Sequence, residues 1–321
     1  MRRFAAKVIL GAGACIGVSL VAVHAEDKFP GKDIDVVLHA GVGGGTDIAL
    51  RSVIPGFGEA LGQRVNVLPK PGGNGVVSLK YMAEQPADGY TLMTLTASHF
   101  AAMAAGKSSW QFSDITCVGR LTDDVEFLMA KKGKYASAKE LVADITSRPI
   151  KIGGAQIGGT DHIAVASLAR KMPEGFKYTY IPFKAAPEIG AALVKGDVDV
   201  GTINYSEAQS MIDSGLIVPM LALSKERQAA QPDVPTSYEL GIEAAFSSLR
   251  AIAMSSKVPQ DRQKVLSEAL VKGMQSDTYQ NYLKGNGLDA NTTADQEKCN
   301  AQLKGIYDDT AAALKEIGFD N

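Results

Sequence analysis

The chain has 321 residues, of which 45% are hydrophobic and 21% are charged. A chain of this length and composition can bury the cores of two domains of ordinary size. Its 33 basic and 35 acidic residues give a formal charge of −2. Because nucleic acids are bound by strongly basic surfaces, this balance argues against a nucleic-acid partner.

The first 25 residues are organised like a secretory signal peptide. Basic residues at positions 2, 3 and 7 precede an apolar run over 8–23, and Val23-His24-Ala25 forms a small-x-small cleavage site. Two alternatives fit less well: a retained anchor would be short for a bilayer, and lipidation of Cys15 would need a leucine where Ala12 stands. We expect a soluble mature chain that begins at Glu26 in the periplasm. It would carry a formal charge of −5, because the peptide removes three basic residues and no acidic one.

The segment Leu38–Leu50, LHAGVGGGTDIAL, reads as the end of a strand, a glycine-rich loop and the start of a helix. Glycines let the backbone approach a ligand closely, and Thr46 and Asp47 stand where the free N–H groups of a first helical turn would face the loop. The pattern therefore suits an anion. It fits neither nucleotide motif, because no lysine follows the glycines and Thr46 occupies the third glycine position of GxGxxG. The alternative is a plain strand-to-helix turn in which Asp47 is a first-turn charge.

Strands and helices alternate after this loop. A strand is expected over Ile34–Ala40, and the following helix should kink or end early at Pro55, Gly56 and Gly58. Another strand, Tyr90–Leu95, ends at Thr96 and Ser98. In open parallel sheets ligands lie beyond the carboxyl ends of the strands, so these hydroxyls should share a rim with Thr46.

The second half begins with two β-rich runs, Ile115–Leu121 and Glu126–Ala130, and a helical stretch, Ala138–Ser147. The design of strand, glycine loop and helix then recurs over Ile150–Ala169, which suggests two facing rims. A further strand, Ser247–Ser256, can return the chain to the first half.

The chain ends on a predicted helix. Thr293 and Gln296 have capping-box spacing ahead of apolar residues at helical intervals, and Gly318 closes the segment. After export, two cysteines remain, Cys117 and Cys299. They would either pair in an oxidising compartment or stay as separate buried thiols. No histidine or acidic cluster has metal-ligand spacing, so neither a metal nor a cofactor is expected.

Several stretches together resemble a known family. They are the signal peptide, GGGTDI (Gly43–Ile48), PG (Pro71–Gly72), PADGYTL (Pro86–Leu92), the loop ending at His162, PFKAAPEIGAALVKGDVDV (Pro182–Val200) and LALSKERQAAQPDVPTSYELG (Leu221–Gly241). In this order and spacing they resemble a Bug-type (TctC-like) solute-binding protein of the tripartite tricarboxylate transporter system. The resemblance covers essentially the whole mature chain.

The resemblance implies an α/β fold, a type II Venus-flytrap binding protein. Each of its two domains would be a mostly parallel sheet flanked by helices, and two crossing strands would join them. We expect one domain over 26–122 and 247–321 and the other over 123–246. The implied function is capture of a small mono- or dicarboxylate and its delivery to a membrane permease, by a monomer without enzymatic activity. The alternatives are a secreted enzyme, for which no GxSxG or HExxH motif is present, and a ligand-sensing module.

The resemblance also implies four ligand-binding loops. Their expected contact residues are His39, Ala40, Gly41, Val42, Gly43, Gly44, Thr46 and Asp47 in the first loop, Thr96, Ser98 and His99 in the second, Gln156, Gly158, Gly159, Thr160 and His162 in the third, and Lys184 and Ala185 in the fourth. The sequence departs from the family pattern at His39 and Ala40, where proline and phenylalanine are usual, and at Ala185, where glycine is common.

Some of these residues also have a structural interpretation. His162 either contacts the ligand or holds its own loop, and His39 either donates to an anion or packs as a neutral side chain. Lys184 is either the partner of a carboxylate or a solvated charge. Thr46 could cap its helix as well as donate to a ligand. Asp47 would repel a bare carboxylate, so it is either structural or the partner of an amino group.

Overall fold

The computed structural model describes residues 28–155, 157–172, 176–316 and 318. The predicted signal peptide, the expected start at Glu26, and Gln156 lie outside these residues. The strands are β1 (Ile34–Leu38), β2 (Val65–Pro69), β3 (Thr91–Leu95), β4 (Ile115–Lys131), β5 (Ile150–Ala155), β6 (Tyr178–Phe183), β7 (Val200–Asn204), β8 (Ile217–Ala222) and β9 (Ser247–Ser255). The helices are α1 (Gly45–Leu61), α2 (Val76–Ala83), α3 (Ala97–Ala104), α4 (Ala138–Ser147), α5 (Thr160–Lys171), α6 (Ala186–Lys195), α7 (Tyr205–Asp213), α8 (Gln260–Met274), α9 (Asp277–Gly285) and α10 (Gln296–Glu316).

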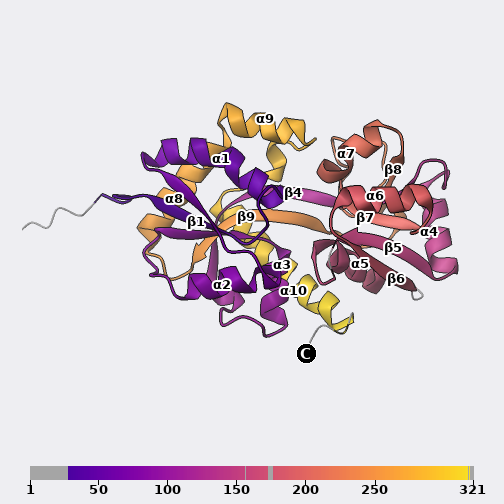
Figure 1. The fold of residues 1–321 in the computed structure, drawn as a ribbon, viewed down its shortest axis with the longest axis horizontal. Helices are drawn as coiled ribbons and strands as arrows, with labels where there is room; N and C mark the ends of the chain where they lie inside the picture. Colours follow the sequence, from indigo (N-terminus) through magenta and orange to yellow (C-terminus); the bar gives the residue numbers. More distant parts are fainter. Residues whose placement is uncertain (1–27, 156, 173–175, 317, 319–321) are drawn as a thin grey trace, which may run out of the picture.

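The molecule has two lobes that are joined by β4 and β9 (Figure 1). The first lobe consists of β1–β3 with α1–α3, α8 and α9, and the second of β5–β8 with α4–α7. The strand order is β2-β1-β3-β9-β4-β7-β5-β6, with β8 also paired to β4. This arrangement confirms the predicted two-domain α/β fold with two crossing strands.

Most non-crossing strands run parallel to their neighbours, as expected for strands that alternate with helices. β1 is parallel to β2 and β3, and β5 is parallel to β6 and β7. The crossing strands pair antiparallel with each other and with both lobes: Met93 of β3 faces Ala253 of β9, and Leu128 of β4 faces Thr202 of β7. The sheet therefore continues from one lobe to the other through β9 and β4.

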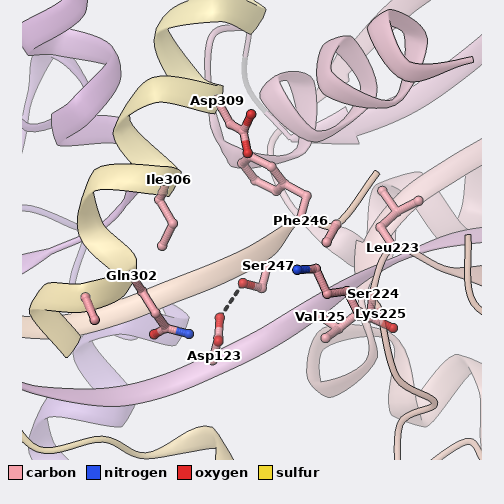
Figure 2. A pocket seen from close by; sticks show the side chains of 13 residues that line it. Asp123, Val125, Leu223, Ser224, Lys225, Phe246, Ser247, Gln302, Ile306 and Asp309 are labelled. Atoms are coloured by element: carbon pink, nitrogen blue, oxygen red, sulfur yellow. Dashed lines mark hydrogen bonds between the residues drawn. The ribbon is translucent and has the colours of Figure 1, made fainter. Parts of the chain in front are cut away.

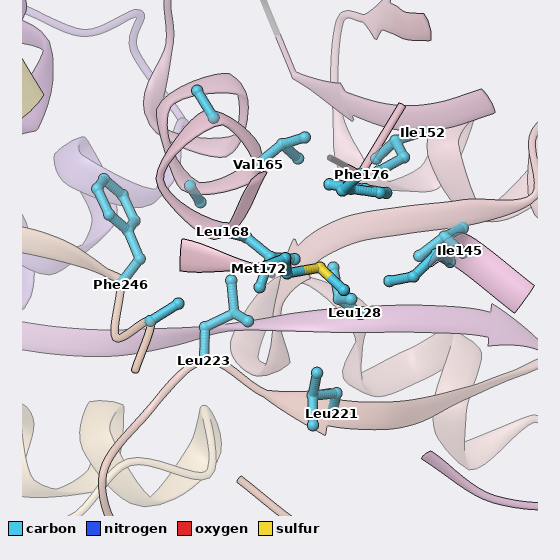
Figure 3. Close-up of a cluster of buried hydrophobic side chains, with 14 of the residues drawn as sticks. Leu128, Ile145, Ile152, Val165, Leu168, Met172, Phe176, Leu221, Leu223 and Phe246 are labelled. Atoms are coloured by element: carbon cyan, nitrogen blue, oxygen red, sulfur yellow. The ribbon is translucent and has the colours of Figure 1, made fainter. Parts of the chain in front are cut away.

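Each lobe buries apolar side chains on both faces of its part of the sheet. In the first lobe, α1, α8 and α9 cover one face, and α2, α3 and α10 cover the other. In the second lobe, Leu128 of β4, Ile145 of α4 and Leu168 of α5 belong to one cluster (Figure 3), and α6 and α7 supply another. Because the end of α10 adds Ala313 and Leu314 to the second-lobe cluster, this helix spans both lobes.

For the first helix we predicted either a kink or an early end near Pro55, and the early end is wrong. α1 continues through Pro55, Gly56 and Gly58 to Leu61. A Cβ added to Gly56 would lie 2.8 Å from the carbonyl oxygen of Gly273 on α8, so the glycine allows two helices to pack closely. This packing compensates for the cost of about 1 kcal/mol that glycine carries in a helix interior.

The two β-rich runs over Ile115–Leu121 and Glu126–Ala130 are parts of one strand, β4, which has 17 residues. The polar residues in the middle of β4 suggested a break between two strands. They occur there because this part of the strand passes between the lobes. By contrast, the predicted helix Ala138–Ser147 is confirmed as α4.

The predicted C-terminal helix is confirmed as α10, but it begins only at Gln296 and its cap is not Thr293. Oδ1 of Asp295 accepts a hydrogen bond from the backbone N–H of Lys298, at 2.9 Å, so Asp295 is the capping residue.

The two cysteines of the mature chain pair with each other: Cys117 of β4 forms a disulfide bond with Cys299 of α10. This bond ties the C-terminal helix to a crossing strand.

Candidate functional site

A cavity of about 200 Å³ lies between the lobes, where the N-termini of α1, α3, α5 and α7 converge. It is lined by His39, Ala40, Gly45, Thr46, Thr96, Ser98, Ala155, Gly159, Thr160, Asp161, Asn204, Glu207, Ser248, Leu249 and Arg250. Helix N-termini present unpaired N–H groups and the positive end of the helix dipole. Their convergence makes the cavity suited to an anionic group.

The first-lobe wall consists of two turns that lead from a strand into a helix. The turn from β1 to α1 contributes Gly45 and Thr46, and the turn from β3 to α3 contributes Thr96 and Ser98. α1 is capped by Gly44 without a side-chain hydrogen bond, so Thr46 lies inside the first turn and is not the cap. Hydroxyl groups and backbone N–H groups thus line this wall, and both can donate to a carboxylate.

His39 connects these two turns. Its Nδ1 lies 2.8 Å from the Thr94 hydroxyl, and its Nε2 lies 3.2 Å from the Thr96 hydroxyl. Burial lowers the pKa of His39 to about 4. The imidazole is therefore neutral at neutral pH and contributes hydrogen bonds rather than charge.

The second-lobe wall is the loop between β5 and α5. Asp161, in the first turn of α5, accepts a hydrogen bond from the N–H of Ala155 at 2.7 Å, and the Tyr180 hydroxyl donates to the carbonyl of Ala155. His162 accepts the N–H of Gly158 at 3.1 Å and stacks on Tyr180, with 4.1 Å between ring centres. Burial lowers the pKa of His162 to about 4. Its position agrees with the interpretation that it holds the loop.

The floor of the cavity is formed by the crossing strands, and Arg250 of β9 dominates it. Its Nη1 is 3.6 Å from Oδ2 of Asp124, and its Nη2 is 3.1 Å from Oε1 of Glu207. Burial lowers the pKa of Arg250, but the carboxylates of Asp124 and Glu207 outweigh that effect and leave it raised. A Cβ added to Gly45 would lie 3.0 Å from the Nη2 atom, so the guanidinium lies directly against the start of α1.

Two buried carboxyl groups near this floor, those of Asp124 and Glu126, and the half-buried carboxyl group of Asp161 have raised pKa values. Burial raises the pKa of Asp124 to about 6 and that of Asp161 to about 7. The pKa of Glu126 is raised well above its ordinary value, by burial first and then by the charges of Asp161, Glu207 and Asp124. These carboxyl groups are therefore crowded, and one guanidinium does not neutralise all of them.

The structure brings together part of the predicted contact set. His39, Ala40, Thr46, Thr96, Ser98, Gly159 and Thr160 all line the cavity. Gly41, Val42, Gly43, Gly44, Gly158, His162, Lys184 and Ala185 are not part of its wall as the structure describes it.

Two further residues of the predicted contact set, Asp47 and His99, stabilise the loops and do not line the cavity. Asp47 is buried, where it accepts the N–H of Gly43 and pairs with Arg51 at 2.7 Å. His99 is fully buried; its Nδ1 accepts the N–H of Thr96, and its Nε2 lies 3.1 Å from the Ser78 hydroxyl. Both side chains hold the loops from behind.

Several wall residues were missed by the sequence reading, notably Arg250, Glu207 and Asn204. A signal for Arg250 was present, because it is the one charged residue in the strand SLRAIAMSS. An arginine buried within an apolar strand requires partners. The strand alone does not say that those partners lie on β4 and α7.

A second cavity, of about 360 Å³, lies between the crossing strands and α10 (Figure 2). Asp123, Val125 and Ser247 line it, whereas Asp124, Ser248 and Arg250 belong to the side of the interlobe cavity. This division follows from the alternation of side chains along a strand. The second cavity is bordered by the middle of α10, at Gln302 and Ile306, and therefore lacks the N–H groups of a helix start.

The fold and the interlobe cavity define a two-lobe solute-binding protein of the periplasmic type. The family model for the tripartite tricarboxylate transporter family receptor (TctC) matches residues 49–316. The chain belongs to this family. Its members are receptors for substrates and not enzymes. Among the residues that the structure describes, no helix is both long enough and apolar enough to cross a membrane.

Two curated relatives are similar over most of the chain. The "UPF0065 protein in gbd 5'region" of Cupriavidus necator is 28% identical, over 88% of this chain and 87% of its own length. Protein BugT of Bordetella pertussis is also 28% identical, over 69% and 70%.

Solved structures show the same fold. A TctC solute-binding protein from Polaromonas, without ligand, matches with a TM-score of 0.80 and 21% identity, over 90% of this chain and 99% of its own. MatC of Rhodopseudomonas palustris with bound malate has a TM-score of 0.72 and 22% identity, over 89% and 100%. An R. palustris protein with adipate has a TM-score of 0.73 and 20% identity, over 90% and 98%.

Proposed function

We propose that this chain is a periplasmic receptor that captures a small mono- or dicarboxylate between its lobes and delivers it to a tripartite tricarboxylate-type permease. The observation that carries this proposal is the convergence of four helix N-termini on one interlobe cavity lined by the hydroxyls of Thr46, Thr96, Ser98 and Thr160. Malate and adipate, bound by two proteins of the same fold, are carboxylates of a suitable kind.

Capture would involve closure of the lobes. In this proposal the domains are residues 26–122 with 247–321 and residues 123–246, and they move about the crossing strands. A ligand that contacts Thr46 on one lobe and Thr160 on the other binds the closed state more tightly than the open one, so it shifts the population towards closure. The receptor acts as a monomer, since a single chain supplies both walls.

The proposal is tested with a panel of mono- and dicarboxylates, first by melting temperature and then by calorimetry. We expect a micromolar-scale dissociation constant, about −8 kcal/mol. Thr46→Ala should weaken binding by about 1.5–3 kcal/mol, or about 10- to 150-fold, because it removes a hydrogen bond to a charged group. Thr146→Ala is a matched control, because this exposed threonine lies on α4. If a sugar stabilises the protein and no carboxylate does, the proposed ligand class is wrong.

Export is tested separately by the intact mass of the secreted protein. The small-x-small site predicts a chain that starts at Glu26. A mass that includes Met1, or a lipid on Cys15, would contradict periplasmic release.

A further inference from the structure

The charged side chains of the interlobe cavity are unevenly distributed. The first-lobe part of the described wall carries hydroxyls, backbone groups and the neutral His39, but no charged side chain. The second-lobe part carries Asp161 and Glu207, and the floor carries Arg250. One end of the cavity therefore suits an anion, and the other end is acidic.

Arg250 already has two carboxylate groups as neighbours. Its Nη1 and Nη2 atoms already face Asp124 at 3.6 Å and Glu207 at 3.1 Å. If all four carboxyl groups were ionised, Asp124, Glu126, Asp161 and Glu207 would outnumber this guanidinium by three charges. A second carboxylate of a ligand, placed at this end, would add a like charge in a poorly solvated site.

Glu126 provides a second, independent observation. Its side chain is fully buried, and its Oε2 atom has no hydrogen-bond partner among the described residues. Its Oε1 atom lies 3.3 Å from the hydroxyl of Ser248, a residue of the cavity wall. The charges that act on this carboxyl include those of Asp161 and Glu207, which also line the cavity. An unpartnered carboxyl oxygen is thus held behind the acidic end of the ligand cavity, where it lacks a donor.

Helix capping explains only part of this arrangement. Asp161 and Glu207 stand in the first turns of α5 and α7, where an acidic residue stabilises the helix dipole. Asp124 and Glu126 lie on a crossing strand and have no such role. The placement of these carboxyl groups around one arginine is unfavourable, as their raised pKa values indicate.

We propose that the acidic end of the cavity, formed by Asp161 and Glu207 with Glu126 behind them, is a subsite for a protonated amine. The ligand is then a small amino carboxylate, with its carboxylate at the start of α1 and α3 and its ammonium group at the start of α5 and α7. This inference rests on the proposed function and narrows its ligand class from carboxylates in general to those that also carry a cationic nitrogen.

The direct test uses pairs of ligands that differ by one amino group: succinate and aspartate, glutarate and glutamate, butyrate and γ-aminobutyrate. Calorimetry at pH 7.5 should show at least 10-fold tighter binding of the amino member in the pair that fits best. Equal or tighter binding of the member without nitrogen would overturn the amine subsite but leave the carboxylate receptor intact. Binding of an amine without a carboxylate, such as putrescine, and of no carboxylate would support the amine subsite and overturn the proposed function. Binding of none of these probes would overturn both.

Substitutions test whether Asp161 and Glu207 cause the preference for the amino ligand. Glu207→Gln and Asp161→Asn keep the shape of the wall and remove one negative charge each. Each should therefore weaken binding of the amino member by about 10- to 100-fold and tighten binding of its partner, which no longer meets that like charge. Asp213→Asn is the matched control, because this exposed residue ends the same helix, α7, and lies away from the cavity. An equal loss for both members of a pair would show that Asp161 and Glu207 only hold the loops, and would overturn the proposal.

The pH dependence of ligand affinity is an independent test of the amine subsite. Asp161 is faced by Glu207 of α7, Arg250 of β9, Glu126 of β4 and Tyr180 of β6, and its pKa is about 7. Ionisation of Asp161 between pH 6 and pH 8 should strengthen binding of the amino member and weaken binding of its partner. The same direction of change for both members would count against the amine subsite.

Discussion

Replacement of Arg250 by methionine should destabilise the fold and make its stability strongly dependent on pH. The arginine side chain is 8% exposed and that of Asp124 is 2% exposed, so the pair is largely removed from water. Methionine retains most of the packing volume but leaves Asp124 with the Ser206 hydroxyl and without a cationic partner. Removal of one member of a buried ion pair costs about 3–5 kcal/mol.

The sign of the pH effect follows from Asp124. Its pKa in the folded protein, about 6, is already above the ordinary value of 3.8, and loss of the guanidinium would raise it further. Above both values the folded chain holds an ionised, buried and unpaired carboxylate, while below pH 5 a proton neutralises it. The loss of stability should therefore grow as the pH rises from 5 to 8, and at pH 5 it should be less than about half its value at pH 8.

Urea unfolding of the mature protein at pH 5 and pH 8 measures both quantities. Arg51→Met is the matched control, because the Arg51 side chain is 50% exposed and its ion pair with Asp47 should contribute at most about 1 kcal/mol. The double variant Arg250→Met/Asp124→Asn should recover most of the lost stability. A loss of less than about 1 kcal/mol at pH 8, or a loss that does not depend on pH, would refute this interpretation of the cavity floor.

Two further predictions concern stability. Asp161→Asn should stabilise the ligand-free protein at pH 8 and have little effect near pH 4. The pKa of Asp161 in the folded protein, about 7, exceeds the ordinary value of 3.8, so the wild-type protein loses stability as the pH rises from about 4 to about 7. Each pKa unit corresponds to about 1.4 kcal/mol, so the gain in stability should not exceed about 4 kcal/mol. A variant that is less stable than the wild type at pH 8 in chemical denaturation would contradict the raised pKa of Asp161. Replacement of Cys117 and Cys299 by alanine should cost about 2–5 kcal/mol, because the disulfide closes a long loop with a sequence separation of 182, and unchanged unfolding under oxidising conditions would show that the crosslink is unimportant.

The sequence predicted the fold well, since strands and helices of this kind are specified by local patterns. The periodic segment Ala138–Ser147 became α4, and Ser247–Ser256 became the crossing strand β9 with one residue fewer. Errors arose where tertiary contacts override local propensity. Gly56 remains within α1 because α8 packs against it, a contact that the residues around Gly56 cannot reveal.

The site was predicted only in part, for a similar reason. Thr46, Thr96 and Gly159 follow strand ends, where the parallel-sheet rule applies, and all three line the cavity. Glu207 and Arg250 come from an ordinary helical turn and from a crossing strand. Their role depends on the meeting of the two lobes, a long-range property that no local motif encodes.

The central claim is that a small carboxylate is bound between the lobes at the starts of α1 and α3. The crystal structure of the mature protein in complex with the carboxylate that raises its melting temperature most tests this claim directly. We predict that a carboxylate oxygen lies within hydrogen-bond distance of the Thr46 or Ser98 hydroxyl or of the first N–H groups of α1. A ligand found instead in the cavity between the crossing strands and α10, beside Ser247 and Gln302, with the interlobe cavity empty, would contradict it.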